Sequence, residues 1–180
     1  LEGNDTDTIL EETLQKMEKH PLIKVHLQSR VLSSYGQVGR FNTTIETEAE
    51  GAFTLEHGVT VLAAGGTEAE TTAYGFGSGE AIVTQKDLEQ KLDDNTLNPE
   101  QLKNVVMIQC VGSREEPRNY CSRICCASSL KKALFLKEKN PDIAVYILYR
   151  DIMTYGFTES YYTEARKAGV IFIPYDLAQK

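Results

Sequence analysis

The sequence predicts an α/β fold in two parts: a helix with a β-meander, followed by a doubly wound, Rossmann-like parallel sheet in three layers. Alternating apolar and polar residues broken by glycines indicate the first part, before about residue 60. After residue 104, apolar strand-like segments alternate regularly with amphipathic helix-like segments, which is typical of a parallel sheet. A polar connection at 93–99 separates the two patterns, so we expect domains at 1–100 and 101–180.

In the N-terminal part, each expected element follows from a local pattern. Apolar residues recur at helical spacing first, and period-two alternation then marks short strands. The last of these strands is almost entirely apolar, as expected for a strand buried on both faces. In order, we expect a helix at 8–19, strands at 22–27, 28–35, 40–47, 52–55 and 59–63, a turn at 56–58, a glycine-rich loop at 67–79 and a helix at 84–92 capped by Thr84.

In the C-terminal part, the elements alternate as β-α-β-α-β. Such alternation implies parallel strands joined by right-handed crossovers. Ligands of these sheets bind beyond the carboxyl ends of the strands, which is where Cys110 falls. The expected strands are 105–110, 143–149 and 170–174, and the expected helices are 122–138 and 158–168.

Charge and hydropathy exclude two classes of partner. The net charge is −7 and lysines and arginines do not cluster, so the basic surface that nucleic acid requires is missing. No apolar run reaches the roughly 18 residues of a membrane span, and the N-terminus has no secretion signal, so we expect a cytoplasmic chain.

The chain lacks an initiating Met and starts directly on a helix-like pattern, so we expect an internal fragment whose site is incomplete.

The four cysteines lie within 17 residues at the spacing C-x10-C-x3-C-C. They are Cys110, Cys121, Cys125 and Cys126. A strand end, a loop and the first turn of a helix can direct four thiolates inward, as a [4Fe-4S] cluster requires. The helix N-terminus would favour the thiolates further. Arg114 and Arg123 flank the cysteines and could offset cluster charge.

Four other interpretations of the cysteines stay open at this point. The first is that they are buried apolar residues, which is common for free cysteines. The second is a zinc-stabilised structural or docking module, although structural zinc sites usually use two C-x2–4-C pairs. The third is a thiol–disulfide redox module, but the spacing lacks C-x-x-C. The fourth is a set of disulfides, which requires an oxidising compartment, whereas no secretion signal is visible.

Arg150-Asp151 follows an expected strand and could meet a ribose or a phosphate, although such pairs are more often solvated.

Two segments carry a resemblance to a known family. They are VVMIQCVGSR at 105–114 and YCSRICC at 120–126. The sequence resembles the A subunits of heterodisulfide reductases and the flavoprotein subunits of quinone-interacting membrane-bound oxidoreductases. The resemblance extends over most of residues 20–175, with support from VTVLAAGG at 59–66, from Thr84-Gln85 and Leu88-Glu89, and from Tyr149 to Ile152.

The resemblance implies a fold similar to thioredoxin reductase, with residues 1–100 as part of an FAD-binding domain and 101–180 as the inserted module. It implies a [4Fe-4S] cluster on the four cysteines. It further implies an FAD-dependent iron–sulfur oxidoreductase that carries electrons between flavin and cluster, working with other redox subunits; no catalytic residue is identified. The family's ATG-type strand end lies by the flavin, here at Ala63, Ala64, Gly65 and Gly66, with Ala64 where threonine is usual.

One departure from the family pattern concerns the nucleotides. The chain has no G-x-G-x-x-G after a first strand, so the pyrophosphate cradle of FAD is absent from this piece. The cysteine loop also stands where a pyridine-nucleotide domain carries its glycine fingerprint. We therefore expect weak or no FAD binding by this chain alone and an inactive fragment, while the use of NAD(P)H is left open by the sequence.

Overall fold

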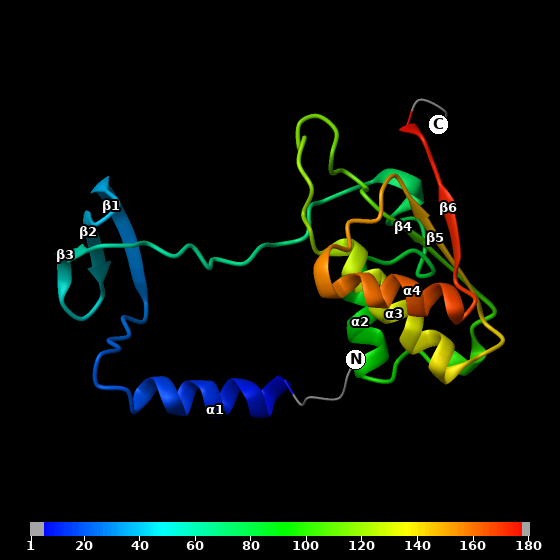
Figure 1. Cartoon of the computed structure of the whole chain (residues 1–180), viewed down its shortest axis with the longest axis horizontal. Helices are drawn as coiled ribbons and strands as arrows, with labels where there is room; N and C mark the ends of the chain where they lie inside the picture. The colour runs from blue at the N-terminus through cyan, green and yellow to red at the C-terminus, as the bar shows by residue number, and fades with distance from the viewer. Residues whose placement is uncertain (1–5, 178–180) are drawn as a thin grey trace. The chain divides into compact units, whose positions relative to one another are not determined.

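A computed structural model describes residues 6–177 of the chain. The chain divides into two compact units between Thr67 and Glu68, and each unit has its own three-stranded sheet (Figure 1). This division lies before the boundary expected near residue 100, because α2 (Gln85–Asp93) places Leu88 in the core of the second unit. The assignment of residues 1–100 to an FAD-binding domain stays a prediction.

The first unit contains the expected helix and β-meander. Helix α1 spans Thr6–Glu18, and strands β1 (Ser29–Gln37), β2 (Arg40–Thr47) and β3 (Gly51–His57) pair in antiparallel order β1-β2-β3. The hairpin between β1 and β2 needs glycine at Gly36, because its φ is +121° and a Cβ there would collide with the carbonyl oxygen of Arg40. The predictions for these four elements are confirmed to within a few residues.

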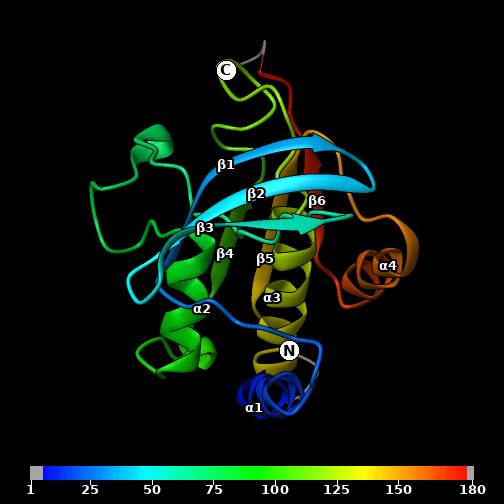
Figure 2. The same cartoon turned by 90° about the vertical axis from the view of Figure 1, so that its left-hand side faces the viewer.

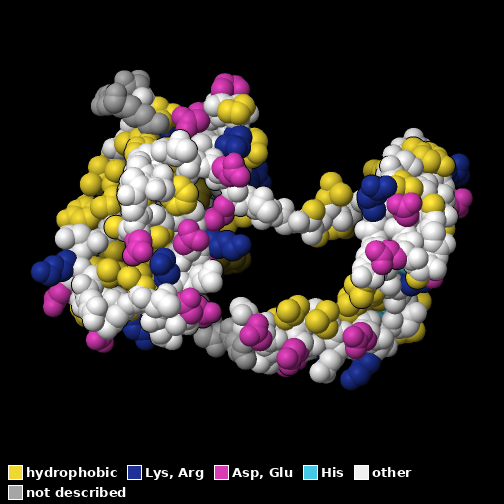
Figure 3. Space-filling view, turned by 180° about the vertical axis from the view of Figure 1, so that it is seen from behind, with side chains coloured by type: hydrophobic (Ala, Val, Ile, Leu, Met, Phe, Trp, Pro, Cys, Tyr) yellow, Lys and Arg dark blue, Asp and Glu magenta, His cyan; other side chains and the backbone are white. Residues whose placement is uncertain are grey.

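Two strands predicted for this unit are wrong. Residues 22–27 and 59–63 are irregular, and the side chains of Val61 and Leu62 are 83% and 90% exposed. Figure 3 shows exposed apolar side chains, in yellow, on the chain that connects the two units. A strand requires a hydrogen-bonded neighbour, and among the described residues neither segment has one in either sheet. The predicted turn at 56–58 is wrong in part, because β3 continues to His57, which pairs with Phe41 and hydrogen-bonds Thr43 Oγ1 at 2.7 Å.

The second unit is a β-α-β-α-β structure with one parallel sheet. Strands β4 (Asn104–Ile108), β5 (Ala144–Tyr149) and β6 (Ile171–Pro174) lie in that order. Helices α3 (Cys125–Lys139) and α4 (Glu159–Lys167) form the two crossovers. All five elements were predicted. The described residues also form three single-turn 3-10 helices: η1 (Ala73–Gly75), η2 (Pro99–Gln101) and η3 (Gly156–Thr158).

The predicted doubly wound, three-layer arrangement is absent from the described residues. Both crossovers step in the same direction, from β4 to β5 and from β5 to β6, so right-handed connections place both helices on one face. Helix α3 packs against α2 and α4, and Figure 2 shows α3 in front of β5, with α2 and α4 on either side of it. The opposite face exposes apolar side chains, including Val106, Ile171 and Ile173. The unit therefore has two layers.

The core of the second unit lies between α3 and β5. Leu130, Ala133 and Leu136 repeat at helical spacing on α3 and are fully buried. They belong to one apolar cluster with Val145 and Ile147, whose alternation on β5 turns both to the helix face. This core fixes the start of α3 against the end of β4, where the cysteines lie. Within residues 6–177, no helix has the length and apolar character to cross a membrane.

Candidate metal centre

The four cysteines lie at the carboxyl edge of the parallel sheet. Cys110 follows the end of β4, is buried, and adopts a left-handed φ of +60°. Cys125 and Cys126 open α3, and Cys126 is buried, whereas Cys121 lies half-exposed in the loop between them. All four thiols are free. The predicted placement on a strand end, a loop and a first helical turn is what the structure has.

A backbone hairpin closes the long loop between Cys110 and Cys121. The Ser113 N–H donates to the Cys110 carbonyl at 3.3 Å, and the Arg114 N–H donates to the Tyr120 carbonyl at 3.1 Å. The hydroxyl of Ser113 donates to the same Tyr120 carbonyl at 2.8 Å. Because Tyr120 immediately precedes Cys121, these bonds turn the loop back and place Cys121 near the Ser113 end of the hairpin.

The dipeptide after β5 holds this hairpin from the neighbouring strand. Arg150 donates from Nη1 to the Ser113 carbonyl at 3.3 Å and from Nη2 to the Arg114 carbonyl at 3.0 Å. The Asp151 carboxylate forms an ion pair with Arg114 Nη2 at 2.6 Å. The nucleotide role considered for Arg150-Asp151 has no support here, because both side chains are engaged with the cysteine loop. Sequence reasoning missed this role, although a charged pair ending the central strand shares its sheet edge with Cys110.

The thiols perturb one another's ionisation. Burial raises the pKa of Cys110, and the neighbouring Arg114 opposes that shift. The pKa of Cys125 is lowered, chiefly because Cys126 donates a hydrogen bond to its sulfur, and the same bond raises the pKa of Cys126. Ser122 Oγ also donates to Cys125 Sγ at 3.5 Å. Cys110, Cys125 and Cys126 therefore affect one another's charge.

Groups that could neutralise an anionic ligand lie beside the thiols. Within the described part of the chain, no three His, Cys, Asp or Glu side chains are close enough together to hold one metal ion as they stand. Arg114 Nη1 is a buried donor without a protein partner, and Ile124 at the N-cap of α3 offers no capping side chain. Both features fit an anionic group bound among these thiols.

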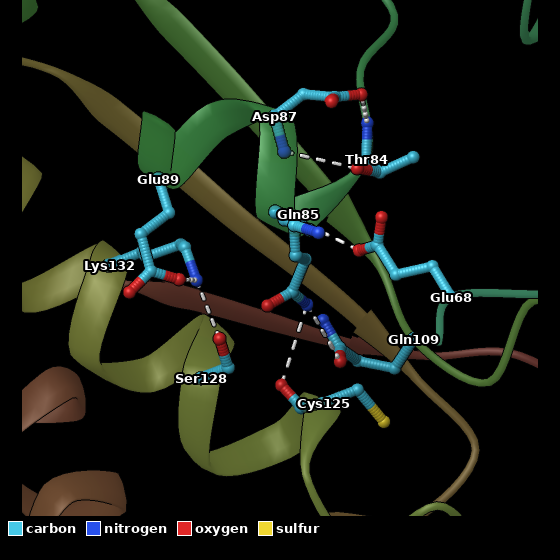
Figure 4. A network of polar contacts seen from close by, with 10 residues as sticks. Glu68, Thr84, Gln85, Asp87, Glu89, Gln109, Cys125, Ser128 and Lys132 are labelled. Carbon is cyan, nitrogen blue, oxygen red and sulfur yellow. Dashed lines mark hydrogen bonds and ion pairs between the residues drawn. The ribbon is translucent and has the colours of Figure 1, made fainter. Parts of the chain in front are cut away.

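A buried amide network connects α2 to the cysteine loop (Figure 4). Gln109, which is fully buried, accepts from Gln85 Nε2 at 3.4 Å, and the same nitrogen donates to the Cys125 carbonyl at 3.4 Å. Tyr175 donates to the Gln109 carbonyl at 2.5 Å, and burial, followed by the Cys110 charge, raises the pKa of Tyr175 to about 12. The backbone before Cys110 is thus fixed on two sides.

A buried lysine ties α2 to α3 beside this network. Lys132 Nζ donates to Glu89 Oε2 at 2.8 Å and to Ser128 Oγ at 2.6 Å, as Figure 4 shows. The side chain of Lys132 is 3% exposed, whereas that of Glu89 is 67% exposed. The Lys132 ammonium is therefore the partner that is removed from water, and the Glu89 carboxylate offsets the free energy that this burial costs.

We expect Glu89→Gln to destabilise the chain by about 1–3 kcal/mol, because the buried Lys132 cation loses its counter-charge. Lys132→Met should change stability by less than about 1 kcal/mol, since the aliphatic stem is replaced by apolar volume and the exposed Glu89 remains solvated. Urea unfolding followed by circular dichroism measures both. The combined Glu89→Gln/Lys132→Met variant serves as the control; if it is as unstable as Glu89→Gln alone, the loss does not come from the unpaired lysine.

Comparison with known proteins gives consistent names. The A subunit of ferredoxin:CoB-CoM heterodisulfide reductase from Methanosarcina acetivorans is 46% identical over 74 residues, 39% of this chain and 9% of the relative. The A subunit of H(2):CoB-CoM heterodisulfide,ferredoxin reductase from Methanothermobacter marburgensis is 37% identical over 131 residues, 63% of this chain and 20% of the relative. The iron-sulfur A subunit of CoB--CoM heterodisulfide reductase from Methanocaldococcus jannaschii is 37% identical over 135 residues, which are 66% of this chain and 20% of the relative.

Part of the chain is therefore similar to the A subunits of heterodisulfide reductases. It spans between 9% and 20% of the length of these three relatives. The chain matches no protein-family model. The resemblance stated from the cysteine segments is thereby confirmed, since the relatives are named as A subunits of heterodisulfide reductases and two of them as iron–sulfur subunits.

The flavin residues expected from the resemblance belong to the first unit, whereas the cysteines belong to the second. Residues 63–66 lie in irregular, exposed chain before the division between the two units. The strand that was expected to end there does not form, and Gly65 has a φ of +66°. The contact of Ala63, Ala64, Gly65 and Gly66 with flavin therefore stays a prediction.

Proposed function

We propose that this chain holds one [4Fe-4S] cluster on Cys110, Cys121, Cys125 and Cys126 and forms the electron-carrying part of an FAD-dependent oxidoreductase. The observation that supports the proposal most is the closed loop between β4 and α3, which brings a strand end and a helix start, with four free thiols, to the carboxyl edge of a parallel sheet. Such a cluster, when bound, supplies reversible one-electron transfer.

The protein's own groups prepare the loop for an anionic cluster. Arg150 holds the loop backbone, the first turn of α3 presents N–H groups, and Arg114 adds a cation beside Cys110. Burial of Cys110 and Cys126 keeps water away from two of the four sulfurs. These groups bind and orient; no described residue is assigned to bond-making.

The setting of the proposed cluster is a larger cytoplasmic enzyme of the heterodisulfide reductase type. The relatives are named as A subunits of reductases for a heterodisulfide, with ferredoxin in two of the names. By analogy we propose FAD as the second cofactor of the full-length protein, with residues 63–66 beside it, and other redox subunits as partners. The proposed role of this chain is to carry electrons between that flavin and the neighbouring redox centres.

Metal analysis of the chain tests the proposal. The chain is purified without oxygen, reconstituted with iron and sulfide, and assayed for iron, acid-labile sulfide and zinc together with its visible spectrum. We expect about four irons and four sulfides per chain. Zinc alone would replace the proposal by a zinc-stabilised module that loses its fold on chelation. No metal after reconstitution would overturn the cluster assignment and favour thiol–disulfide chemistry.

A further inference from the structure

We infer that Arg114 is a positioning residue for this site: its fixed guanidinium stabilises the reduced form of the bound group and so raises its reduction potential. The inference rests on the proposed function. It goes beyond that function because it assigns the potential to a particular side chain outside the four thiols. Arg114 binds no metal, and it acts through the Cys110 sulfur and through the local field.

The position of Arg114 is fixed at both its backbone and its side chain. Its N–H donates to the Tyr120 carbonyl at 3.1 Å, and its carbonyl accepts from Arg150 at 3.0 Å. The backbone adopts a left-handed φ of +61°, which an arginine rarely adopts. Asp151 then holds Nη2 at 2.6 Å. A side chain restrained in this way loses little entropy when it acts on a neighbour.

The second amino group of Arg114 is the observation that points to a ligand. Nη1 is buried and has no hydrogen-bond partner among the described residues. A buried unpaired donor is costly in a folded protein, so such groups usually serve an ion, a water or a ligand. The Ser113 N–H, next to Arg114 in the chain, donates to the Cys110 carbonyl at 3.3 Å. The free donor and the thiol therefore share one small region.

The charge of Arg114 does not vary with pH in the working range. Its ion pair with Asp151 raises the pKa of a guanidinium that is already always protonated. Reduction adds one electron, supplied in the experiment by dithionite, and no proton moves to or from Arg114. The added negative charge interacts favourably with the fixed cation, and this interaction is stronger where the side chain is largely shielded from water.

Potentiometric titration of the reconstituted chain, followed by electron paramagnetic resonance, tests the inference. Arg114→Gln removes the cation but keeps a similar length. We expect its midpoint potential to fall by an amount equivalent to about tenfold in the reduction equilibrium, which is about 59 mV for one electron. The matched control is Arg123→Gln, because Arg123 also has a left-handed φ of +61° in the same loop but is solvent-exposed. Its shift should be several-fold smaller because solvent screens it.

A second variant keeps the test decisive if Arg114→Gln does not fold. Asp151→Asn removes the carboxylate that partly neutralises Arg114, so its midpoint potential should rise. Equal potentials in Arg114→Gln and Arg123→Gln, or a fall in Asp151→Asn, would overturn the role of Arg114 while the cluster assignment stands. Absence of iron from the unsubstituted chain would instead overturn the proposed function, and this inference with it.

Discussion

Cys110→Ser is expected to lower the iron content of the reconstituted chain from about four atoms to below about one. Cys110 is buried after β4, and its serine hydroxyl would be a poor ligand in a place where no other thiol can substitute. The loop cannot rearrange freely, because Ser113 and Arg114 are bonded to Tyr120 and Arg150. Iron and sulfide analysis after anaerobic reconstitution gives the result directly.

Ser122→Ala is the matched control for this experiment. Ser122 belongs to the same loop and donates to Cys125, but it carries no thiol. Its iron content should stay at about four atoms, so that loss in the cysteine variant reports a lost ligand and not a damaged loop. Serine variants of Cys121, Cys125 and Cys126 complete the set. Full iron content in any one of the four would remove that cysteine from the ligand assignment.

Leu130→Ala is expected to destabilise the chain by about 2–5 kcal/mol. Leu130 is fully buried on α3 and lies in the apolar cluster with β5, so truncation leaves a cavity that the close-packed sheet and helices cannot fill. A domain is stable by only about 5–15 kcal/mol, so the loss is a large fraction of the total. Urea unfolding of the second unit, followed by tyrosine fluorescence and circular dichroism, measures it.

Glu138→Ala on the same helix separates packing from helix propensity. Glu138 is exposed on α3, and alanine is a good helix former, so its effect should stay within about 0.5 kcal/mol. An equal loss in the two variants would mean that the α3–β5 cluster is not the core that holds the second unit together.

Local patterns predicted most of the elements because each pattern had a local cause. Thr84 caps its helix as expected, and Asp87 completes a capping box in which both reciprocal bonds are present. The strands at 104–108 and 144–149 have the expected apolar character and pair in parallel. Such features depend on neighbours three or four residues away, or on one face of one element.

Features that depend on distant partners could not be predicted in this way. The apolar segment at 59–63 has the composition of a buried strand, but pairing depends on a neighbouring strand that composition does not reveal. Likewise, the number of layers depends on strand order, and the β4-β5-β6 order puts both crossovers on one face. Both errors came from assigning a tertiary arrangement to a secondary-structure pattern.

The sequence predicted the cysteines of the candidate site but not the polar residues that hold the cysteine loop in place. Spacing alone placed Cys110 at a strand end and Cys125 at a helix start, and both positions are as expected. The contacts of Arg150 with the loop backbone join residues more than thirty positions apart. Gln85 likewise reaches Cys125 from a helix that sequence patterns assigned to the other domain. Long-range polar contacts of this kind leave no local signal.

The hairpin between Ser113 and Tyr120 determines where the chain tolerates a change of length. Ten residues separate Cys110 from Cys121 in the sequence, but the hydrogen bonds that close the hairpin bring the two ends of this segment together before any ligand binds. Each doubling of a flexible loop costs only about 0.6 kcal/mol, so extra residues at the tip, beyond Glu115 and Arg118, would extend into solvent at little cost. An insertion between Tyr120 and Cys121 would instead displace a thiol. Natural and engineered length variation in this loop should therefore be confined to the tip.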